Sequence, residues 1–156
     1  SHGGEREIIA TDISSKSLQL ALRFGADSVI NVSAETEALK ALRTDIGQVD
    51  LAFETSGTSS EAQIAFTCVK PGGRIIQMIQ GADVMVAPDL LISKEIEYCG
   101  AFRFQEEFEW AVDLLAKRAI DLAHLLGAAM PFRNARAAFD LAANRSEATK
   151  VQLVFE

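Results

Sequence analysis

The sequence lacks the features that mark membrane, nucleic-acid-binding or secreted proteins. No apolar run approaches the roughly 20 residues that a membrane-spanning helix needs, and the start carries no basic and apolar leader. Basic residues are fewer than acidic ones, with 15 Lys and Arg against 22 Asp and Glu. The resulting net charge of -7 disfavours binding to nucleic-acid phosphates and to anionic lipid. The two cysteines, Cys68 and Cys99, have no C-x-x-C spacing. We therefore expect reduced, buried thiols in a cytoplasmic protein that binds neither nucleic acid nor membrane.

A glycine-rich phosphate loop is also missing in front of the first apolar strand, Ile8 to Asp12. In doubly wound nucleotide-binding folds, an acid that ends the second strand accepts hydrogen bonds from ribose hydroxyls. That acid normally lies about 20 residues after a G-x-G-x-x-G turn. Only residues 1–7 precede the apolar strand here. We therefore expect a fragment that lacks the first strand, the glycine-rich turn and the helix that holds the pyrophosphate.

The segments that are present alternate between β-branched runs and helical periodicity, which is typical of a parallel sheet with crossover helices. Hydrophobic residues make up 49% of the chain, enough for a sizeable core. Predicted strands are Ile8 to Asp12, Ser28 to Val32, Val49 to Glu54, Arg74 to Met78 and Glu95 to Cys99. Predicted helices are Lys16 to Phe24 with a Ser14 or Ser15 cap, Thr36 to Asp45, Ser60 to Val69 and a turn at Pro88 to Ile92. The sequence predicts an α/β, doubly wound (Rossmann) parallel sheet without its first strand.

The pattern changes after Gln105. A helix to Arg118, an irregular segment to Leu126, a helix from Ala135 to Ala143 capped by Asn134, and a last strand to Phe155 do not continue the βα units. We therefore predict a partial cofactor-binding domain over residues 6–118 and a segment over 119–156 that leaves this domain and returns to a different one.

The chain resembles the medium-chain, zinc-dependent alcohol dehydrogenase family, in particular its branch of sorbitol and L-idonate 5-dehydrogenases. The resemblance extends over nearly the whole chain after Arg6, and it rests on the order and spacing of short motifs. They are Ile9-Ala10-Thr11-Asp12, Phe24-Gly25-Ala26-Asp27, Glu54-Thr55-Ser56-Gly57, Lys70-Pro71-Gly72-Gly73-Arg74, Lys94-Glu95-Ile96, Gly100-Ala101-Phe102-Arg103-Phe104 and Lys150-Val151-Gln152-Leu153.

The resemblance implies a set of cofactor-binding residues. Asp12 matches the acid that binds the ribose, and its charge would repel a 2'-phosphate, so NAD is favoured over NADP. The basic residue that often follows five positions later is replaced by Ser17, with Lys16 one position off. The remaining implied cofactor contacts are Thr55, Ser56 and Gly57 in a turn on the adenine side, Met78, Ile79 and Gln80 near the nicotinamide carboxamide, and Phe102 and Arg103.

The resemblance also places the substrate beside Arg103 and Phe104. An arginine in an active-site cleft can hold a sugar-acid carboxylate through two hydrogen bonds. Phe104 stands where a tyrosine is usual and lacks its hydroxyl. At each of these positions a structural role, as a tight turn or a surface ion pair, is the alternative.

The implied activity is oxidation of a secondary alcohol of a polyol or sugar acid by hydride transfer to NAD, with zinc polarising the alcohol. The sequence has no metal-ligand spacing that joins Cys68, Cys99 and His124, and we interpret His124 as a partly buried structural residue. We therefore expect no metal site, no catalytic residue and no activity in this chain alone. The alternatives are a non-catalytic nucleotide-sensing or dimerisation module and a zinc-free, NADPH-dependent quinone-reductase relative.

The missing strand predicts a problem in the sheet. In the strand order 3-2-1-4-5-6 it lies between the strand that ends at Asp12 and the strand Val49 to Glu54. Each buried backbone N–H or C=O group without a hydrogen-bond partner lowers the stability of the fold by roughly 1–3 kcal/mol. We expect the gap to be filled by a separate N-terminal piece, by a second copy in a homo-oligomer, or by collapse of the two edges onto each other.

Overall fold

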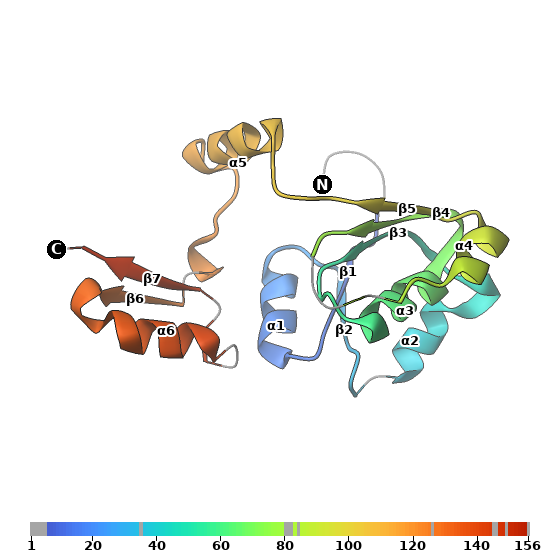
Figure 1. Cartoon of the computed structure of the whole chain (residues 1–156), viewed down its shortest axis with the longest axis horizontal. Helices are drawn as coiled ribbons and strands as arrows, with labels where there is room; N and C mark the ends of the chain where they lie inside the picture. Colours follow the sequence, from blue (N-terminus) through green and yellow to red (C-terminus); the bar gives the residue numbers. More distant parts are fainter. Residues whose placement is uncertain are drawn as a thin grey trace. The chain divides into compact units, whose positions relative to one another are not determined.

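A computed structural model describes residues 6–34, 36–79, 83, 85–125, 127–144, 147–148 and 150–155. The chain separates into two compact units, one formed by residues 1–33 with 105–156 and the other by residues 34–104 (Figure 1). Both contain parallel strands joined through helices. The predicted α/β fold with parallel strands is confirmed.

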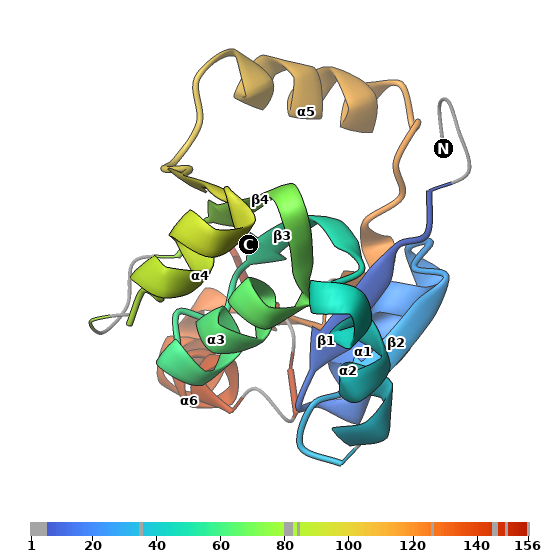
Figure 2. The same ribbon diagram turned by 90° about the vertical axis from the view of Figure 1, so that its right-hand side faces the viewer.

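The unit of residues 34–104 is built on a three-stranded parallel sheet in the order β3-β4-β5. Its elements are α2 (Thr36–Leu42), the 3-10 helix η1 (Thr44–Ile46), β3 (Val49–Glu54), α3 (Ser59–Cys68), β4 (Val69–Gln77), α4 (Pro88–Lys94) and β5 (Glu97–Gly100). Figure 2 shows α3 and α4 side by side, and both contact β4. The helix predicted through Asp45 ends earlier, because Asp45 has a φ of 48°.

The core of this unit lies between α3 and the sheet. Ala62 and Phe66 come from α3, Val69 and Ile75 from β4, and Ile96 from the start of the β5 segment. Phe66, Val69 and Ile75 are at most 1% exposed, and burial of each such side chain stabilises the fold by about 1.5–3 kcal/mol. The α3 helix, which follows the Thr55–Gly57 turn, is therefore fixed firmly against the sheet.

The sequence predicts that Pro71-Gly72-Gly73 precedes β4. In the structure these residues lie within β4. The register moves from Val49 opposite Val69 to Leu51 opposite Arg74, so β4 accommodates extra residues as a bulge. A Cβ atom on Gly73 would lie 2.6 Å from Val69 Cγ1 and 2.9 Å from the Asp50 carbonyl oxygen. Glycine is required here because the two strands approach closely.

The second unit contains two separate parallel pairs, β1-β2 and β6-β7. Its elements are β1 (Ile9–Asp12), α1 (Ser15–Arg23), β2 (Ser28–Asn31), α5 (Glu106–Ala116), η2 (Ala123–Leu125), β6 (Ala128–Pro131), η3 (Phe132–Asn134), α6 (Ala135–Ala143) and β7 (Val151–Val154). Ser14 caps α1 as predicted, since its side chain accepts a hydrogen bond from the Ser17 N–H. Asn134 occupies the N-cap position of α6 as predicted, but its side chain makes no capping hydrogen bond there.

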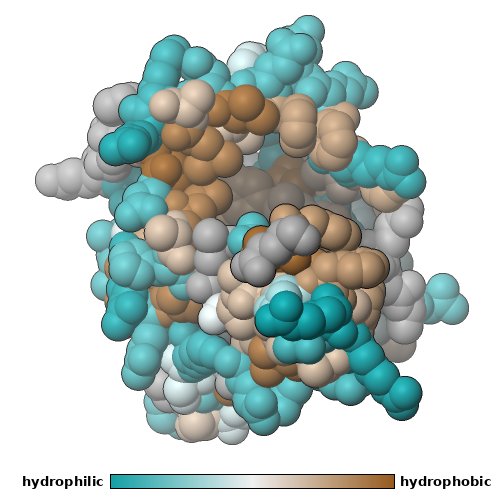
Figure 3. All heavy atoms as spheres, turned by 90° about the vertical axis from the view of Figure 1, so that its left-hand side faces the viewer, coloured by the Kyte–Doolittle hydropathy of each residue, from teal (hydrophilic) through white to brown (hydrophobic). Residues whose placement is uncertain are grey.

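One cysteine and several apolar side chains are exposed. Cys68 is buried as predicted, but Cys99 is exposed, because β5 is the edge strand of its sheet. No residue of α5 is buried, and its Phe108 and Trp110 are more than half exposed. Figure 3 shows apolar atoms gathered in the upper part of one face.

The strands β1 and β3, which flank the predicted gap, belong to different units. Within its own unit, β1 pairs with β2, and β3 pairs with β4. What fills the gap, whether a separate N-terminal piece, a second copy or collapse of the two edges onto each other, stays a prediction.

Candidate functional site

The carboxyl ends of β3, β4 and β5 meet at one edge of their sheet. Glu54, the last residue of β3, is opposite Gln77, the last residue of β4, and Gln77 is opposite Gly100, the last residue of β5. Because the three strands are parallel, the segments that follow them leave the sheet on the same side. These segments carry Thr55–Gly57, Met78–Ile79 and Phe102–Phe104, so three of the predicted site segments are brought together. Ligands of open α/β sheets bind at this kind of edge.

Asp12 is the last residue of β1, in the other unit, and is half-buried. Its Oδ1 atom accepts a hydrogen bond from the Ser14 N–H at 2.7 Å. That bond fixes the carboxylate at the start of α1. The second oxygen, Oδ2, has no hydrogen-bond partner in the described part of the chain. It is therefore available to accept a hydroxyl proton from a ligand.

The basic residue near Asp12 is used elsewhere. Lys16 donates from Nζ to the backbone carbonyl of Glu147 at 2.8 Å, and Ser17 uses its N–H to complete the helix cap at Ser14. In this arrangement neither residue supplies a positive charge to the Asp12 carboxylate.

The turn after β3 is held together by hydrogen bonds within it. Thr55 and Ser56 are exposed, whereas Gly57 is buried with a φ of 71°. The Ser56 hydroxyl donates to Glu54 Oε1 and accepts from the Thr58 N–H at 3.1 Å. The hydroxyl of Ser56 is thus used in hydrogen bonds within the turn. The exposed Thr55 side chain is the one that can contact a ligand.

The segment after β4 continues the sheet for one residue. The Met78 N–H donates to the Glu54 carbonyl at 2.9 Å, and the Ile79 carbonyl accepts from Gln77 Nε2 at 3.3 Å. Both apolar side chains are more than 40% exposed. Gln80, the third residue predicted here, lies outside the described residues.

Arg103 has an unusual backbone conformation, with a φ of 58°. Its guanidinium carbon lies 4.8 Å from the centre of the Phe102 ring, a cation–π contact. Arg103 forms no salt bridge with the described residues, so none of their carboxylates takes up its donors. Phe102 and Phe104 are both more than 60% exposed.

Glu54 was missed as a functional residue, although the charge at the end of an apolar strand was a visible signal. It is 4% exposed, and its carboxylate accepts hydrogen bonds from Ser56, Gly57 and Gln77. Burial by itself would raise the pKa of Glu54, but the hydrogen bonds from Ser56, Gln77 and Gly57 outweigh burial and lower the pKa. The carboxylate therefore stays ionised at neutral pH.

Lys94, the last residue of α4, is a buried cation that binds the C-terminal end of α3. It is 6% exposed, and Nζ donates to the carbonyl oxygens of Phe66, Thr67 and Val69 at 3.0, 3.0 and 2.9 Å. These carbonyls form the end of α3, where a positive charge complements the helix dipole. Burial lowers the pKa of Lys94, and nearby Cys68 acts in the opposite direction.

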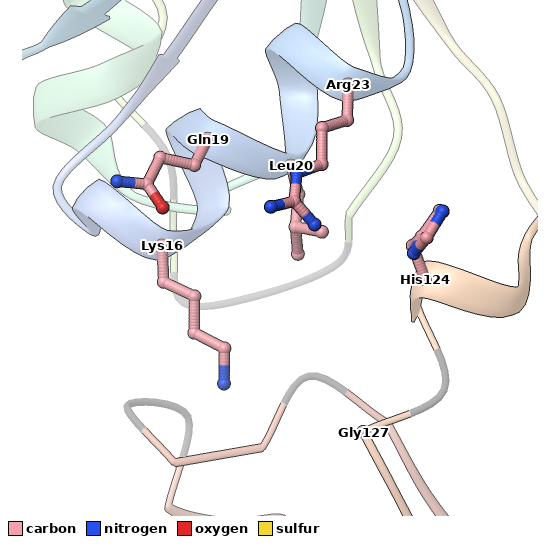
Figure 4. Close-up of a pocket in the computed structure, with 6 residues that line it drawn as sticks. All are labelled: Lys16, Gln19, Leu20, Arg23, His124 and Gly127. Atoms are coloured by element: carbon pink, nitrogen blue, oxygen red, sulfur yellow. The ribbon is translucent and has the colours of Figure 1, made fainter.

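The described residues do not fit the zinc ion that the family resemblance implies. Nowhere in the described part of the chain do three or more His, Cys, Asp or Glu side chains gather as a metal ion would require. His124 is exposed, so its predicted partial burial is wrong. It lines an open cavity of about 250 Å³ with Lys16, Gln19, Leu20, Arg23 and Gly127, none of which is a predicted site residue (Figure 4). Among the described helices, none has both the length and the apolar character needed to cross a membrane.

Comparison with known proteins agrees with this arrangement. Residues 1–117 match the family described as "Zinc-binding dehydrogenase". L-idonate 5-dehydrogenase (NAD(P)(+)) of Escherichia coli is 35% identical over 153 residues, which are 97% of this chain and 44% of that enzyme. Its crystal structure superposes with a TM-score of 0.91 over the same shares. Sorbitol dehydrogenase of Bacillus subtilis is 29% identical over 79% of this chain and 36% of its own length.

The family match covers three quarters of the chain, and the protein belongs to the zinc-binding dehydrogenases. Members of this class are oxidoreductases, and the relatives named above act on polyols or sugar acids according to their names. The chain spans less than half the length of either relative.

Proposed function

We propose that this chain is the dinucleotide-binding part of a zinc-type dehydrogenase that oxidises a secondary alcohol of a polyol or sugar acid with NAD. The observation that carries the proposal is the common edge formed by the ends of β3, β4 and β5. It brings Thr55, Met78, Ile79, Phe102 and Arg103 to the side of the sheet where nucleotides bind in such folds.

Each predicted segment has a proposed role. Asp12 accepts hydrogen bonds from the adenosine ribose through its open oxygen. The Thr55–Gly57 turn borders the nucleoside, and Met78, Ile79 and Gln80 face the nicotinamide. Arg103 holds the substrate carboxylate beside Phe104, which fits a guanidinium without a salt bridge in the described chain.

The described residues contain no group of three or more candidate metal ligands, so we assign the metal that polarises the alcohol to a part of the enzyme outside them. We also propose that residues 6–118 form a partial cofactor domain and that 119–156 pack on the catalytic domain. A further polypeptide, either that domain or a second copy, would then pair with the open edges of β1 and β3.

The proposed activity can be tested with a hybrid protein. The chain is joined to the part of the E. coli L-idonate 5-dehydrogenase that its match does not cover. We expect the folded, zinc-loaded hybrid to reduce NAD with L-idonate. We expect the 156-residue chain with added zinc to be inactive, because its described residues contain no set of metal ligands. The hybrid with Arg103→Ala is the control for the substrate site. A folded, zinc-containing hybrid that is inactive on L-idonate and sorbitol, or activity of the chain alone, contradicts the proposal.

A further inference from the structure

Side chains from the three strands form one continuous hydrogen-bonded chain across the sheet. Tyr98, two residues before the end of β5, donates from its hydroxyl to Gln77 Oε1 at 3.1 Å. Gln77, the last residue of β4, donates from Nε2 to Glu54 Oε2 by a short bond. Glu54 ends β3, so a single side-chain network joins the three strands beside the edge where the predicted cofactor segments leave the sheet.

The other end of the network fixes the turn. Glu54 Oε1 accepts from the backbone N–H of Ser56 at 2.8 Å and of Gly57 at 3.2 Å. It also accepts the hydroxyl proton of Ser56. Both backbone donors of the turn therefore point toward a buried carboxylate of their own chain.

This orientation decides what the turn can recognise. Loops that bind phosphate direct successive N–H groups toward the anion. Here the N–H groups of Ser56 and Gly57 are used by Glu54, and an ionised carboxylate lies directly behind them. A second negative group at this turn would be repelled and would find no free donor at these two positions. The open groups are the Thr55 side chain and backbone carbonyls, which suit hydroxyl or amino donors of a ligand.

We propose that Glu54 is a positioning residue for the cofactor, an inference that rests on the proposed function. Gln77 and Tyr98 hold the Glu54 carboxylate from the sheet side, and this carboxylate holds the Thr55–Gly57 turn in one conformation through Ser56 and Gly57. Glu54 thereby makes the turn a site for the uncharged nucleoside part of the dinucleotide, not for its phosphates. Burial of a carboxylate that touches no substrate is costly, and the hydrogen bonds to the turn offset that cost. The tight turn itself could be formed by a neutral side chain.

The test compares Glu54→Gln, the double variant Glu54→Gln with Gln77→Glu, and the exposed control Glu37→Gln in the 156-residue chain. Amide hydrogen exchange is measured at Ser56 and Gly57 and in the β3–β4 ladder, and NAD affinity is measured by calorimetry. In Glu54→Gln, we expect protection at Ser56 and Gly57 to fall about tenfold, because a charged acceptor is lost. Protection of the ladder should be unchanged, and NAD should bind about tenfold more weakly. Glu37→Gln should change none of these quantities.

The double variant separates positioning from stability. It recreates an amide–carboxylate pair between positions 54 and 77 and keeps an acceptor for Tyr98, but it leaves the turn with a neutral acceptor. We expect recovery of any lost global stability without recovery of protection at Ser56 and Gly57.

Unchanged protection of the turn in Glu54→Gln, or its full recovery in the double variant, overturns the role of the Glu54 carboxylate. Lost protection with unchanged NAD affinity overturns the link to the cofactor. If the wild-type chain does not bind NAD, the proposed function and the cofactor role fail together, while exchange at the turn still reports on Glu54.

Discussion

Replacement of Lys94 by methionine should lower the free energy of unfolding by about 3–5 kcal/mol. Methionine has nearly the same length, so the hydrophobic packing is largely kept while the donor is removed. Three carbonyl oxygens at the end of α3, those of Phe66, Thr67 and Val69, then lose a charged partner in a buried place. Each buried polar group left without a partner costs about 1–3 kcal/mol, and water reaches this site poorly.

The measurement is urea denaturation followed by circular dichroism, with Lys40→Met as the matched control. Lys40 is exposed and pairs with Glu37 one helical turn away, so its loss should cost less than about 0.5 kcal/mol. If Lys94→Met does not fold, Lys94→Gln retains an amide donor and should fold with an intermediate loss. Equal stability of Lys94→Met and Lys40→Met would show that the buried cation does not support α3.

Replacement of Gly47 by alanine should destabilise the protein by about 3–5 kcal/mol, from strain and overlap together. Gly47 has a φ of 120°, and an added Cβ would lie 2.4 Å from the Val69 carbonyl oxygen. The neighbouring atom is backbone at the start of β4, so it cannot move away without loss of sheet pairing. Because Gly47 directly precedes the entry to β3, this strain would also be transmitted to the strand that carries Glu54.

Gly72→Ala provides the control for Gly47→Ala. Gly72 also has a positive φ, of 70°, but a Cβ there would meet no atom within 4 Å. Its cost should be limited to backbone strain of about 1–2 kcal/mol. Thermal or urea unfolding of both variants compares them, and a Gly47→Ala variant that loses no more stability than Gly72→Ala would contradict the close approach to Val69.

The sequence predicted elements best where local signals alone determine them. The bounds of β3 agree with prediction because an apolar run is followed directly by the turn residues Thr55 to Gly57. The start of β4 was wrong because the pairing of Val69 with Val49 is a long-range contact that overrides the local breaker Pro71-Gly72-Gly73. Exposure of Cys99 likewise depends on the position of β5 at the sheet edge, which local hydropathy does not reveal.

The candidate site shows the same division. The segments Thr55–Gly57, Met78–Ile79 and Phe102–Phe104 were identified by resemblance, and parallel pairing explains why they meet. The network of Glu54, Gln77 and Tyr98 could not be predicted, because its members lie 21 to 23 residues apart in sequence and are joined only by strand register. The proposed boundary near residue 118 and the roles of the site residues stay predictions.

The most direct test of the account is calorimetric titration of the 156-residue chain with NAD and NADP, in the wild type and in Asp12→Ala, Asp12→Asn and the exposed control Asp140→Ala. We predict weak binding that favours NAD about ten- to a hundredfold, because Asp12 accepts ribose hydroxyls and repels a 2'-phosphate. Asp12→Ala should abolish the preference without unfolding the chain. Asp12→Asn, which can keep the bond to Ser14, should reduce it, and Asp140→Ala should retain it. Tighter binding of NADP by the wild type, or binding of neither nucleotide, would contradict the account.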